Sequence, residues 1–233
     1  MIYLSVIMPV FNEQATVGIT LQKLVRAHDV HQVVIVDDGS TDRSPAIIKK
    51  FISLHTKKQK KRPQFLFIQK VNGGKGSAIQ AALPKVTGNY VLIQDADCEY
   101  DPADIPDLLA PIKKGRVKVV YGSRFAGPHL NLLFWHRVGN YALNFLVNIL
   151  YNTTLSDMET CYKVLPTSLL KKIDLQSKGF DIEPEITCKI LKQKIRIFEV
   201  PISYIGRDFS EGKKITWVDA FHALRVIWIE RLK

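Results

Sequence analysis

Three acidic side chains alternate along the chain directly after an apolar run. The run covers residues 90–93, and Asp95, Asp97 and Glu99 follow it. In an extended segment, side chains two residues apart leave the backbone on the same side, so these carboxylates can converge on one hard cation. Magnesium and manganese ions prefer oxygen ligands, and Mg²⁺ typically keeps one or two protein carboxylates and completes its shell with water and phosphate oxygens. The stretch therefore predicts a Mg²⁺ or Mn²⁺ site that holds a diphosphate.

Two further acids in the same stretch have a structural explanation. Asp101 precedes Pro102, and Asp104 follows two residues later. Helices commonly begin with Asp at the N-cap, Pro at the first position and an acid in the first turn, where the helix dipole favours negative charge. We therefore expect Asp101 and Asp104 to begin a helix rather than to bind a ligand.

The composition excludes disorder and points to an anionic partner. The 233 residues are 46% hydrophobic, enough for a sizeable core in one domain. Lys and Arg number 33 against 22 Asp and Glu, a net charge of +11, which suits a phosphorylated substrate, an acidic lipid surface or nucleic acid. Three widely spaced cysteines argue against a disulfide framework and favour a reducing, cytoplasmic compartment.

Apolar runs alternate with helical patterns in the first half of the chain. Strands are expected at residues 2–8, 31–36, 65–68, 90–94 and 117–121, with helices up to residue 27, around residues 47–52, and at 76–86 and 102–114. Such alternation predicts an α/β fold with a mostly parallel, Rossmann-like sheet covered by helices on both faces. After residue 122 the alternation stops, and a mixed segment is expected.

Polar residues gather where the predicted strands end. Ligands of open α/β sheets bind outside the carboxyl ends of the strands. The loops at that edge carry Glu13, Asp37, Asp38, Lys75, Asp95, Asp97 and Glu99. The glycine-rich residues 71–77 do not form a Walker loop, because Gln69 stands where glycine is required and Gly76 takes the hydroxyl position. We expect these glycines to let the backbone pass close to a ligand or a neighbour, beside a nucleotide site.

Two helical patterns in the second half leave alternatives open. Leu143, Leu146, Val147 and Leu150 form a stripe that fits packing on the sheet or contact with a membrane surface. Residues 217–228 carry Trp217, Phe221, Leu224 and Trp228, which suit docking on the domain or lying at a bilayer interface. Asp181 or Glu183 is expected to cap a helix.

Membrane contact, if any, should be peripheral. Residues 130–151 are interrupted by polar side chains, against about 20 mostly apolar residues for a span. Residues 1–10 lack the basic start of a signal peptide. The basic run at residues 57–62 fits a solvated surface or attraction to acidic lipid, and no aromatic residues interleave it for nucleic-acid stacking. We expect a cytoplasmic protein on the cytosolic face of a membrane and no nucleic-acid partner.

With these residues laid out, the chain resembles family 2 glycosyltransferases of the GT-A fold, and among them the polyprenyl-phosphate (dolichyl-phosphate) mannose and glucose synthases. The resemblance runs nearly end to end. Its motifs, in order, are VIMPVFNE, VVIVDDGSTD, NGGKGSA, QDADCEYDP, YGSRF, LSDMETCYKVL, GFDIEPEIT and EVPISYIGRDFSEGKK. It implies one GT-A domain over residues 1–233, with a nucleotide-sugar half at 1–122, an acceptor half at 123–215 and an amphipathic helix at 216–233.

The resemblance also implies roles for individual residues. The nucleotide of a sugar donor such as UDP-glucose or GDP-mannose would be held by Pro9, Val10, Phe11, Glu13, Asp37, Asp38, Lys75, Asp95 and Ala96. Asp97 and Glu99 would bind the metal. The phosphate of a polyprenyl acceptor would meet Arg124, Arg137, Arg207, Lys213 and Lys214. Asp97, Arg124, Asp157 and Glu159 would form the catalytic set, with the last two near the sugar.

The acceptor decides whether a base is needed. A phosphate monoester has its second ionisation near pH 6, so it arrives as an anion and requires cations such as Arg124 instead of a base. A direct displacement then inverts the anomeric centre. A hydroxyl of a glycan or protein would require a base, for which Asp157 or Glu159 is the candidate. A third hypothesis for the function of the chain is a non-catalytic basic module that binds acidic membranes.

Overall fold

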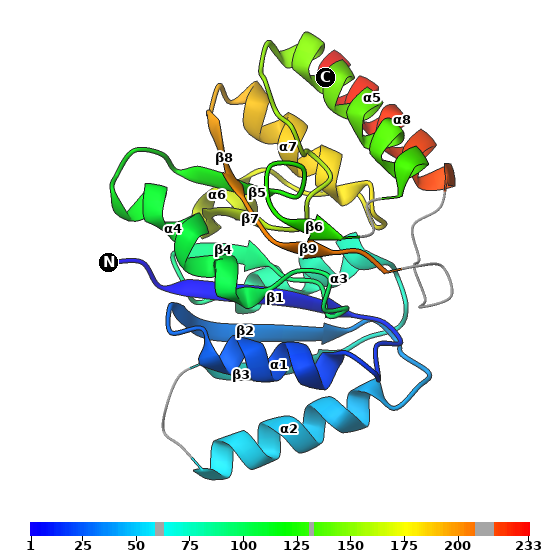
Figure 1. Cartoon of the computed structure of the whole chain (residues 1–233). Helices are drawn as coiled ribbons and strands as arrows, with labels where there is room; N and C mark the ends of the chain where they lie inside the picture. The colour runs from blue at the N-terminus through cyan, green and yellow to red at the C-terminus, as the bar shows by residue number, and fades with distance from the viewer. Residues whose placement is uncertain (59–62, 131–132, 208–216) are drawn as a thin grey trace.

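The computed structural model describes residues 1–58, 63–130, 133–207 and 217–233 (Figure 1). Its centre is a seven-stranded sheet with the order β3-β2-β1-β4-β7-β5-β8. The strands are β1 (Leu4–Val10), β2 (Val30–Asp37), β3 (Gln64–Gln69), β4 (Tyr90–Ile93), β5 (Val119–Ser123), β7 (Lys163–Pro166) and β8 (Ile197–Pro201). A separate parallel pair joins β6 (His129–Leu130) to β9 (Tyr204–Ile205).

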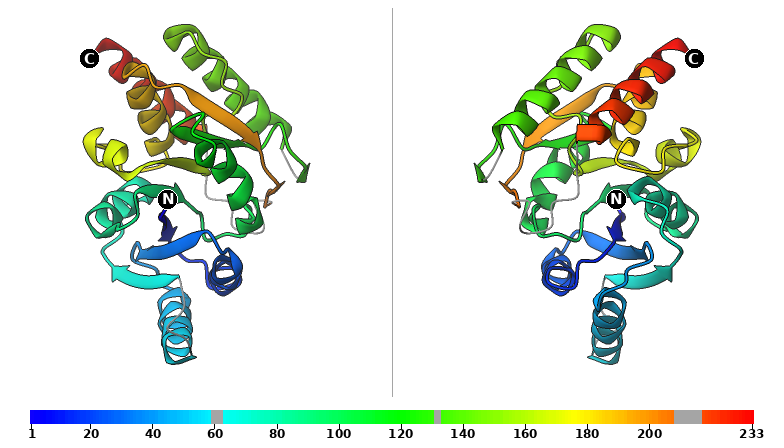
Figure 2. Two further views of the ribbon diagram at one scale, coloured as in Figure 1. Left: turned by 90° about the vertical axis from the view of Figure 1, so that its left-hand side faces the viewer. Right: turned by 90° about the vertical axis from the view of Figure 1, so that its right-hand side faces the viewer.

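Eight α-helices are described. They are α1 (Val17–Arg26), α2 (Ser44–Lys58), α3 (Lys75–Ala82), α4 (Ile105–Lys113), α5 (Phe134–Tyr151), α6 (Thr167–Lys172), α7 (Ile182–Lys192) and α8 (Trp217–Leu232), with 3₁₀ turns η1 (Leu83–Lys85) and η2 (Pro102–Asp104). In Figure 2, α1 and α4 cover one face of the sheet and α3 and α6 the other. Helices on both faces explain why β2 is buried at every residue except His31.

The sheet is mostly parallel, as expected, with one strand reversed. All neighbouring strands run parallel except β7, which is antiparallel to both β4 and β5. Because β7 and β8 join the same sheet as β1–β4, the sheet crosses the division expected at residue 122. The two predicted halves therefore share one core.

Among the element ends that differ from the expectation, two have a local explanation. Strand β1 continues through Pro9 to Val10, where Pro9 pairs with Val36. Strand β4 pairs with β1 only up to Ile7, so β1 has a single neighbour at Pro9 and the missing N–H is tolerated. The helix expected from residue 102 begins as the 3₁₀ turn η2, and the Asp101 carboxylate accepts a bond from the Ala103 N–H at 3.0 Å. Asp104 instead accepts the Ser203 N–H at 2.8 Å.

A second apolar cluster holds α5, α7 and α8 together. Its buried members are Leu143, Val147, Met158, Cys188, Ala223 and Ile227, with Leu146 and Leu150 partly buried against them. The stripe on α5 thus packs on α7 and α8. Packing on the sheet and contact with a membrane were the two expectations, and this stripe does neither. Among the described residues, no helix is long and apolar enough to cross a membrane.

Two isoleucines on α8 test this packing. Ile227 is fully buried in the second cluster, whereas Ile229 on the same helix is 37% exposed. We expect Ile227→Ala to lower the free energy of unfolding by about 2–5 kcal/mol, because it removes buried methylenes and leaves a cavity. Ile229→Ala should cost less than about 1 kcal/mol. Urea denaturation measures both, and equal losses would contradict the described orientation of α8.

Candidate active site

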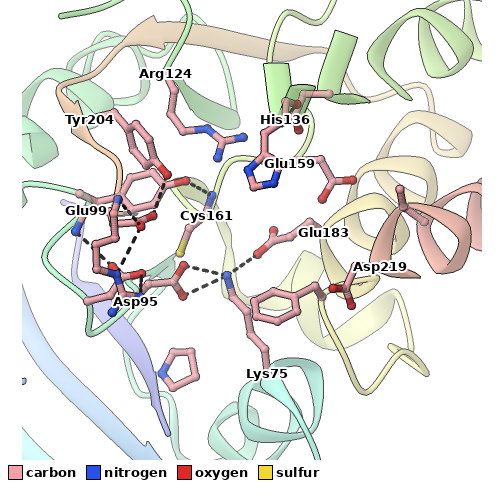
Figure 3. Close-up of a pocket in the computed structure, with 18 of the residues that line it drawn as sticks. Lys75, Asp95, Glu99, Arg124, His136, Glu159, Cys161, Glu183, Tyr204 and Asp219 are labelled. Carbon is pink, nitrogen blue, oxygen red and sulfur yellow. Dashed lines mark hydrogen bonds and ion pairs between the residues drawn. The ribbon is translucent and has the colours of Figure 1, made fainter. Parts of the chain in front are cut away.

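A cavity of about 890 Å³ lies at the carboxyl ends of β1, β2 and β4 and extends to the first turns of α5 and α8 (Figure 3). Most of the residues expected at a site line this cavity. They are Pro9, Val10, Phe11, Glu13, Asp38, Lys75, Asp95, Ala96, Asp97, Glu99, Arg124, Arg137, Glu159 and Arg207. Asp37 and Asp157 are not among its lining residues, and Lys213 and Lys214 lie outside the described residues.

Lys75 is held between two carboxylates at the floor of the cavity. Its Nζ lies 2.9 Å from an oxygen of Asp95 and 2.9 Å from an oxygen of Glu183, as Figure 3 shows. Burial works to lower the pKa of Lys75, but Asp95, Cys161 and Glu183 outweigh it and hold the pKa well above its usual range. Lys75 therefore stays positively charged inside the cavity.

Glu183 is a site residue that the sequence reasoning missed. Its carboxylate also receives Lys163 Nζ at 2.5 Å, and the Lys163 side chain is fully buried. Burial favours a raised pKa for Glu183, but Lys163 and Lys75 outweigh it and the pKa is lowered. Glu183 was expected as a possible helix cap, whereas its side chain pairs with two lysines. A charged residue among the apolar residues of α7 was the available signal, because such a residue is buried only when paired.

Arg207 lies among three carboxylates. Its guanidinium contacts Glu13 at 3.2 Å, Asp97 at 3.0 Å and Glu99 at 3.4 Å. Burial, followed by repulsion from Asp95 and Glu99, raises the pKa of Asp97 to about 7, although Arg207 acts in the opposite direction. This part of the cavity therefore holds more negative charge than Arg207 alone compensates.

The expected convergence of Asp95, Asp97 and Glu99 on one cation is not observed. Within the described part of the chain, no three His, Cys, Asp or Glu side chains gather closely enough to form a metal cluster by themselves. In this structure the carboxylates are paired with cations: Lys75 contacts Asp95, and Arg207 bridges Asp97 and Glu99. Arg207, which was expected at an acceptor phosphate, contacts these carboxylates in the structure, and its role toward a phosphate stays a prediction.

Glu99 also fastens the segment around β9 to the loop after β4. Its carboxylate accepts the Tyr204 hydroxyl at 2.7 Å and the Arg207 backbone N–H at 3.0 Å. The Ile205 N–H donates to the Glu99 carbonyl at 3.0 Å. Glu99 therefore positions Arg207 whether or not it also binds a metal.

Arg124 is fixed by a buried carboxylate that is not among the residues lining the cavity. Asp157 accepts its Nε at 2.8 Å, its Nη2 at 2.7 Å and its backbone N–H at 2.9 Å. Asp157 is fully buried and is not among the lining residues, so it acts on the cavity through Arg124. Burial works against the charge of Arg124, but Asp157 outweighs it and raises the pKa of Arg124 further. Asp157 therefore positions a permanent cation at the cavity wall.

Glu159 lines the cavity. Its Oε1 is buried and accepts no hydrogen bond from the residues that the structure describes. Burial is the main cause that raises the pKa of Glu159 to about 7, while Lys163 and Arg124 oppose the shift. Figure 3 places Glu159 across the cavity from Glu99, near Glu183 and His136. Near neutral pH this carboxyl group can hold or release a proton.

Asp38 shapes the glycine-rich loop. Its carboxylate accepts Lys70 Nζ at 2.5 Å and the backbone N–H groups of Gly73 at 3.1 Å and Gly74 at 2.7 Å. A side chain at Gly76 would meet the Ser177 carbonyl oxygen at 2.3 Å, so this glycine allows close approach to a neighbour. Asp37 accepts bonds from Ser40 and Gln69 and is 2% exposed. Asp38, unlike Asp37, faces the cavity.

Arg137 stands on the exposed first half of α5. Its guanidinium carbon lies 5.9 Å from the centre of the Phe125 ring, and Arg124 approaches the same ring at 5.6 Å. Arg124 and Arg137 therefore place two cations around one ring at the cavity wall, where Arg124 directly follows the carboxyl end of β5.

The family model described as glycosyl transferase family 2 matches residues 5–174. The chain belongs to glycosyl transferase family 2. The match takes in β1 to α6 and therefore Asp38, Lys75, Asp97, Arg124 and Glu159. It ends before Glu183 and Arg207, so these contacts are additions to what the family model covers.

Two relatives of this glycosyltransferase carry functional names. The chain is 28% identical over 97% of its length to the low-salt glycan biosynthesis hexosyltransferase Agl6 of Haloferax volcanii. It is 23% identical over 90% of its length to the dodecaprenyl-phosphate galacturonate synthase of Rhizobium johnstonii. The chain spans 53% of the first relative and 61% of the second, so it corresponds to only part of each.

A solved structure supports the fold. The crystal structure of glucosyl-3-phosphoglycerate synthase from Mycobacterium tuberculosis matches with a TM-score of 0.74 and 16% identity, over 98% of this chain and 80% of that one. The predicted GT-A type α/β architecture is thereby confirmed.

Removing the charge of Glu183 should destabilise the fold. We expect Glu183→Gln to lower the free energy of unfolding at neutral pH by about 3–5 kcal/mol, because Lys163 is left buried without its counter-charge. The pKa of Glu183 is lowered in the fold, so its contribution is complete above its ordinary value of 4.5 and is lost as the pH falls through the folded value. The difference between wild type and variant in urea denaturation should therefore shrink in acid.

The neighbouring Glu185→Gln is the matched control. Glu185 pairs with Lys189, whose side chain is 14% exposed, and it accepts the backbone N–H groups of Gln176 and Ser177, for which a glutamine keeps one acceptor oxygen. The variant should cost only about 1 kcal/mol. Two results would contradict the proposed role of Glu183 as the counter-charge of the two lysines. One is an equal loss of unfolding free energy in Glu183→Gln and Glu185→Gln. The other is a difference between wild type and Glu183→Gln that does not change with pH.

Proposed function

We propose that this chain is a metal-dependent inverting glycosyltransferase that moves a hexose from a nucleoside-diphosphate sugar to a polyprenyl phosphate. One observation carries the proposal. A single cavity joins the carboxylates at the strand ends to two cations, Arg124 and Arg137, and to aromatic side chains on α5 and α8. Carboxylates suit a metal with a diphosphate, arginines suit a phosphate acceptor, and aromatic side chains suit its apolar chain.

The charge at the strand ends fits a divalent cation. Asp97 has its pKa raised by burial and by two acidic neighbours, so positive charge placed there is favourable. We propose Asp97, with Glu99, as the one or two protein ligands that Mg²⁺ or Mn²⁺ keeps, with phosphate oxygens and water completing the shell. A metal bound there would supply charge to stabilise the leaving nucleoside diphosphate. Arg207 neutralises the same carboxylates, so it and the ion would compete for them.

The donor would lie along the edge of the sheet. We propose that the nucleotide contacts the loop after β1, from Pro9 to Glu13, together with Asp38 and the start of the loop after β4. Lys75 adds a fixed positive charge close to Asp95, on the side where a diphosphate would lie. The likeness to a synthase crystallised with UDP-glucose and Mn²⁺ makes UDP-glucose one donor to test, and GDP-mannose is the other.

The acceptor phosphate needs cations more than a base. Arg124, held in place by Asp157, offsets the repulsion between two anionic substrates, and Arg137 adds to it. A phosphate oxygen attacks the anomeric carbon as the bond from that carbon to the diphosphate oxygen breaks, and the configuration inverts. The relative named dodecaprenyl-phosphate galacturonate synthase supports this acceptor class. We propose that the reaction takes place at the cytosolic face of a membrane.

A hydroxyl acceptor is the second candidate, and Glu159 favours it. Its unpartnered oxygen and its pKa of about 7 suit a base that accepts the proton of a sugar or protein hydroxyl. Asp157 does not compete for this role, because both of its oxygens are occupied by Arg124.

Asp97→Asn should abolish turnover. Loss of the proposed metal ligand is expected to lower nucleoside-diphosphate release roughly a thousandfold or more. Release is measured from a panel of sugar nucleotides with polyprenyl phosphate and Mn²⁺ or Mg²⁺. The melting temperature should not fall, because the variant removes repulsion among Asp95, Asp97 and Glu99.

Asp101→Asn in the same loop serves as the control. Its carboxylate is 39% exposed and pairs with Lys23, away from the cavity. This variant should keep nearly all activity. An Asp97→Asn enzyme that turns over like wild type would exclude the proposed metal role.

The pH profile of Glu159→Gln separates the two acceptors. With a hydroxyl acceptor, kcat/KM should rise through about pH 7 as Glu159 loses its proton, and the variant should lack that rise. With a phosphate acceptor, the rise should come from the acceptor near pH 6 and should persist in the variant. Loss of the rise with polyprenyl phosphate as acceptor would contradict the phosphate mechanism.

A further inference from the structure

All three tryptophans of the sequence lie on α5 and α8, and all are exposed. Trp135 is 77% exposed, Trp217 75% and Trp228 49%. Tryptophan is a costly residue to leave in water, because it presents a large apolar surface. Their shared location on two packed helices therefore marks one surface of the molecule.

Helix α5 carries a second apolar stripe, distinct from the one that packs on α7 and α8. Its members are Phe134, Val138, Tyr141, Phe145 and Ile149, at spacings of 4, 3, 4 and 4, with exposed fractions from 43% to 72%. Spacings of three and four place these side chains on one face of a helix. None of these five side chains belongs to either of the described apolar clusters.

Helix α8 repeats the arrangement. Val218, Phe221, Ile229 and Leu232 are exposed, and Arg225 takes the position between the two pairs. We call the exposed apolar residues of α5 and α8 the aromatic face. Contiguous apolar exposure of this kind in a chain with a well-formed core marks a binding surface.

The charges around the aromatic face are basic. The exposed charged side chains of the two helices are Arg137, Arg225 and Arg231, and Lys233 follows directly. Of the two acids, Glu230 is 5% exposed and pairs with Lys233, and Asp219 lines the cavity. An apolar surface whose exposed charges on the two described helices are positive is complementary to an anionic lipid surface. Two copies placed face to face would instead bring like charges together.

The aromatic face is continuous with the cavity. Trp135 and Trp217, in the first turns of α5 and α8, are exposed and also line the cavity that holds Asp97 and Arg124. The two helices lie side by side at the end of the molecule opposite α2 (Figures 1 and 2). A surface that receives this face therefore lies at the opening of the cavity.

We propose that the aromatic face docks on the interface of an anionic lipid bilayer, with the rings of Trp135 and Trp217 at headgroup level and the cavity opening onto the membrane. The docking itself is independent of catalysis, and only its purpose rests on the proposed function. It would let the phosphate of a lipid acceptor enter the cavity while the lipid chain stays in the bilayer. Aromatic rings at the water interface with basic side chains beside them are typical of peripheral membrane helices.

The tryptophans provide the test, because all indole emission of the protein comes from this surface. The protein is titrated with vesicles of phosphatidylcholine and with vesicles that also contain phosphatidylglycerol. We expect the emission to shift to shorter wavelength, acrylamide quenching to weaken and brominated lipid to quench the emission. All three effects should be stronger with phosphatidylglycerol.

Variants away from the cavity identify the contact. Tyr141→Ala, Phe145→Ala and Phe221→Ala combined should lower vesicle partitioning roughly tenfold or more, because each removes exposed aromatic area. Arg225→Gln with Lys233→Gln should reduce the preference for phosphatidylglycerol roughly tenfold. Ile19→Ala with Leu54→Ala, at positions 51% and 52% exposed on α1 and α2, should change neither. Circular dichroism checks that each variant keeps its helices.

Two results would overturn the proposal. One is tryptophan emission that vesicles do not change. The other is emission and molar mass that change with protein concentration in the absence of lipid, which would assign the face to a second copy of the chain. Docking without any transfer activity would refute the proposed function alone. Transfer to detergent-dispersed polyprenyl phosphate without docking would refute this inference alone.

Discussion

Glu183 receives two ammonium groups at the floor of the cavity, Lys75 Nζ at 2.9 Å and Lys163 Nζ at 2.5 Å, and so joins α3, β7 and α7. Lys75 extends the same line of charge to Asp95, at the end of β4. Because unpaired buried charges are costly, these elements cannot separate without losing counter-charges that water only partly replaces. The shape of the cavity floor is therefore set by electrostatics as much as by packing.

Much of the fold follows from local pattern. Buried runs such as residues 33–36 alternate with amphipathic segments, and the rule that parallel strands present their carboxyl ends at one edge brings Asp38, Asp95 and Asp97 to a common cavity. What the pattern did not show is β7, a four-residue strand that inserts antiparallel between β4 and β5. Four residues are too few for a period to distinguish a strand from a loop.

The partners of the site residues were beyond sequence reasoning for a similar reason. Arg207 and Glu13 are 194 residues apart in the sequence, and only the folded chain brings them together. Asp157 lies in a polar motif, and its sequence does not show that both carboxylate oxygens accept hydrogen bonds from Arg124. The sequence shows which types of residue lie at the site. It does not show which of them pair, because pairing depends on distances that only the folded structure sets. Exposure was equally hidden, since the outer stripe of α5 looks from sequence like a second core face.

The position of β7 in the sheet also sets the order in which strands can pair during translation. Strand β5 finds its neighbours only in β7 and β8, which end at residues 166 and 201. As the chain leaves the ribosome, β1 to β4 can pair in turn, whereas β5 must wait about forty more residues for β7 and about eighty for β8, a few seconds or more of elongation. During that interval a bare strand edge is open to wrong partners. A fragment that stops at residue 174 would keep this edge permanently, so we expect the family-matched region alone to aggregate rather than to fold as an independent unit.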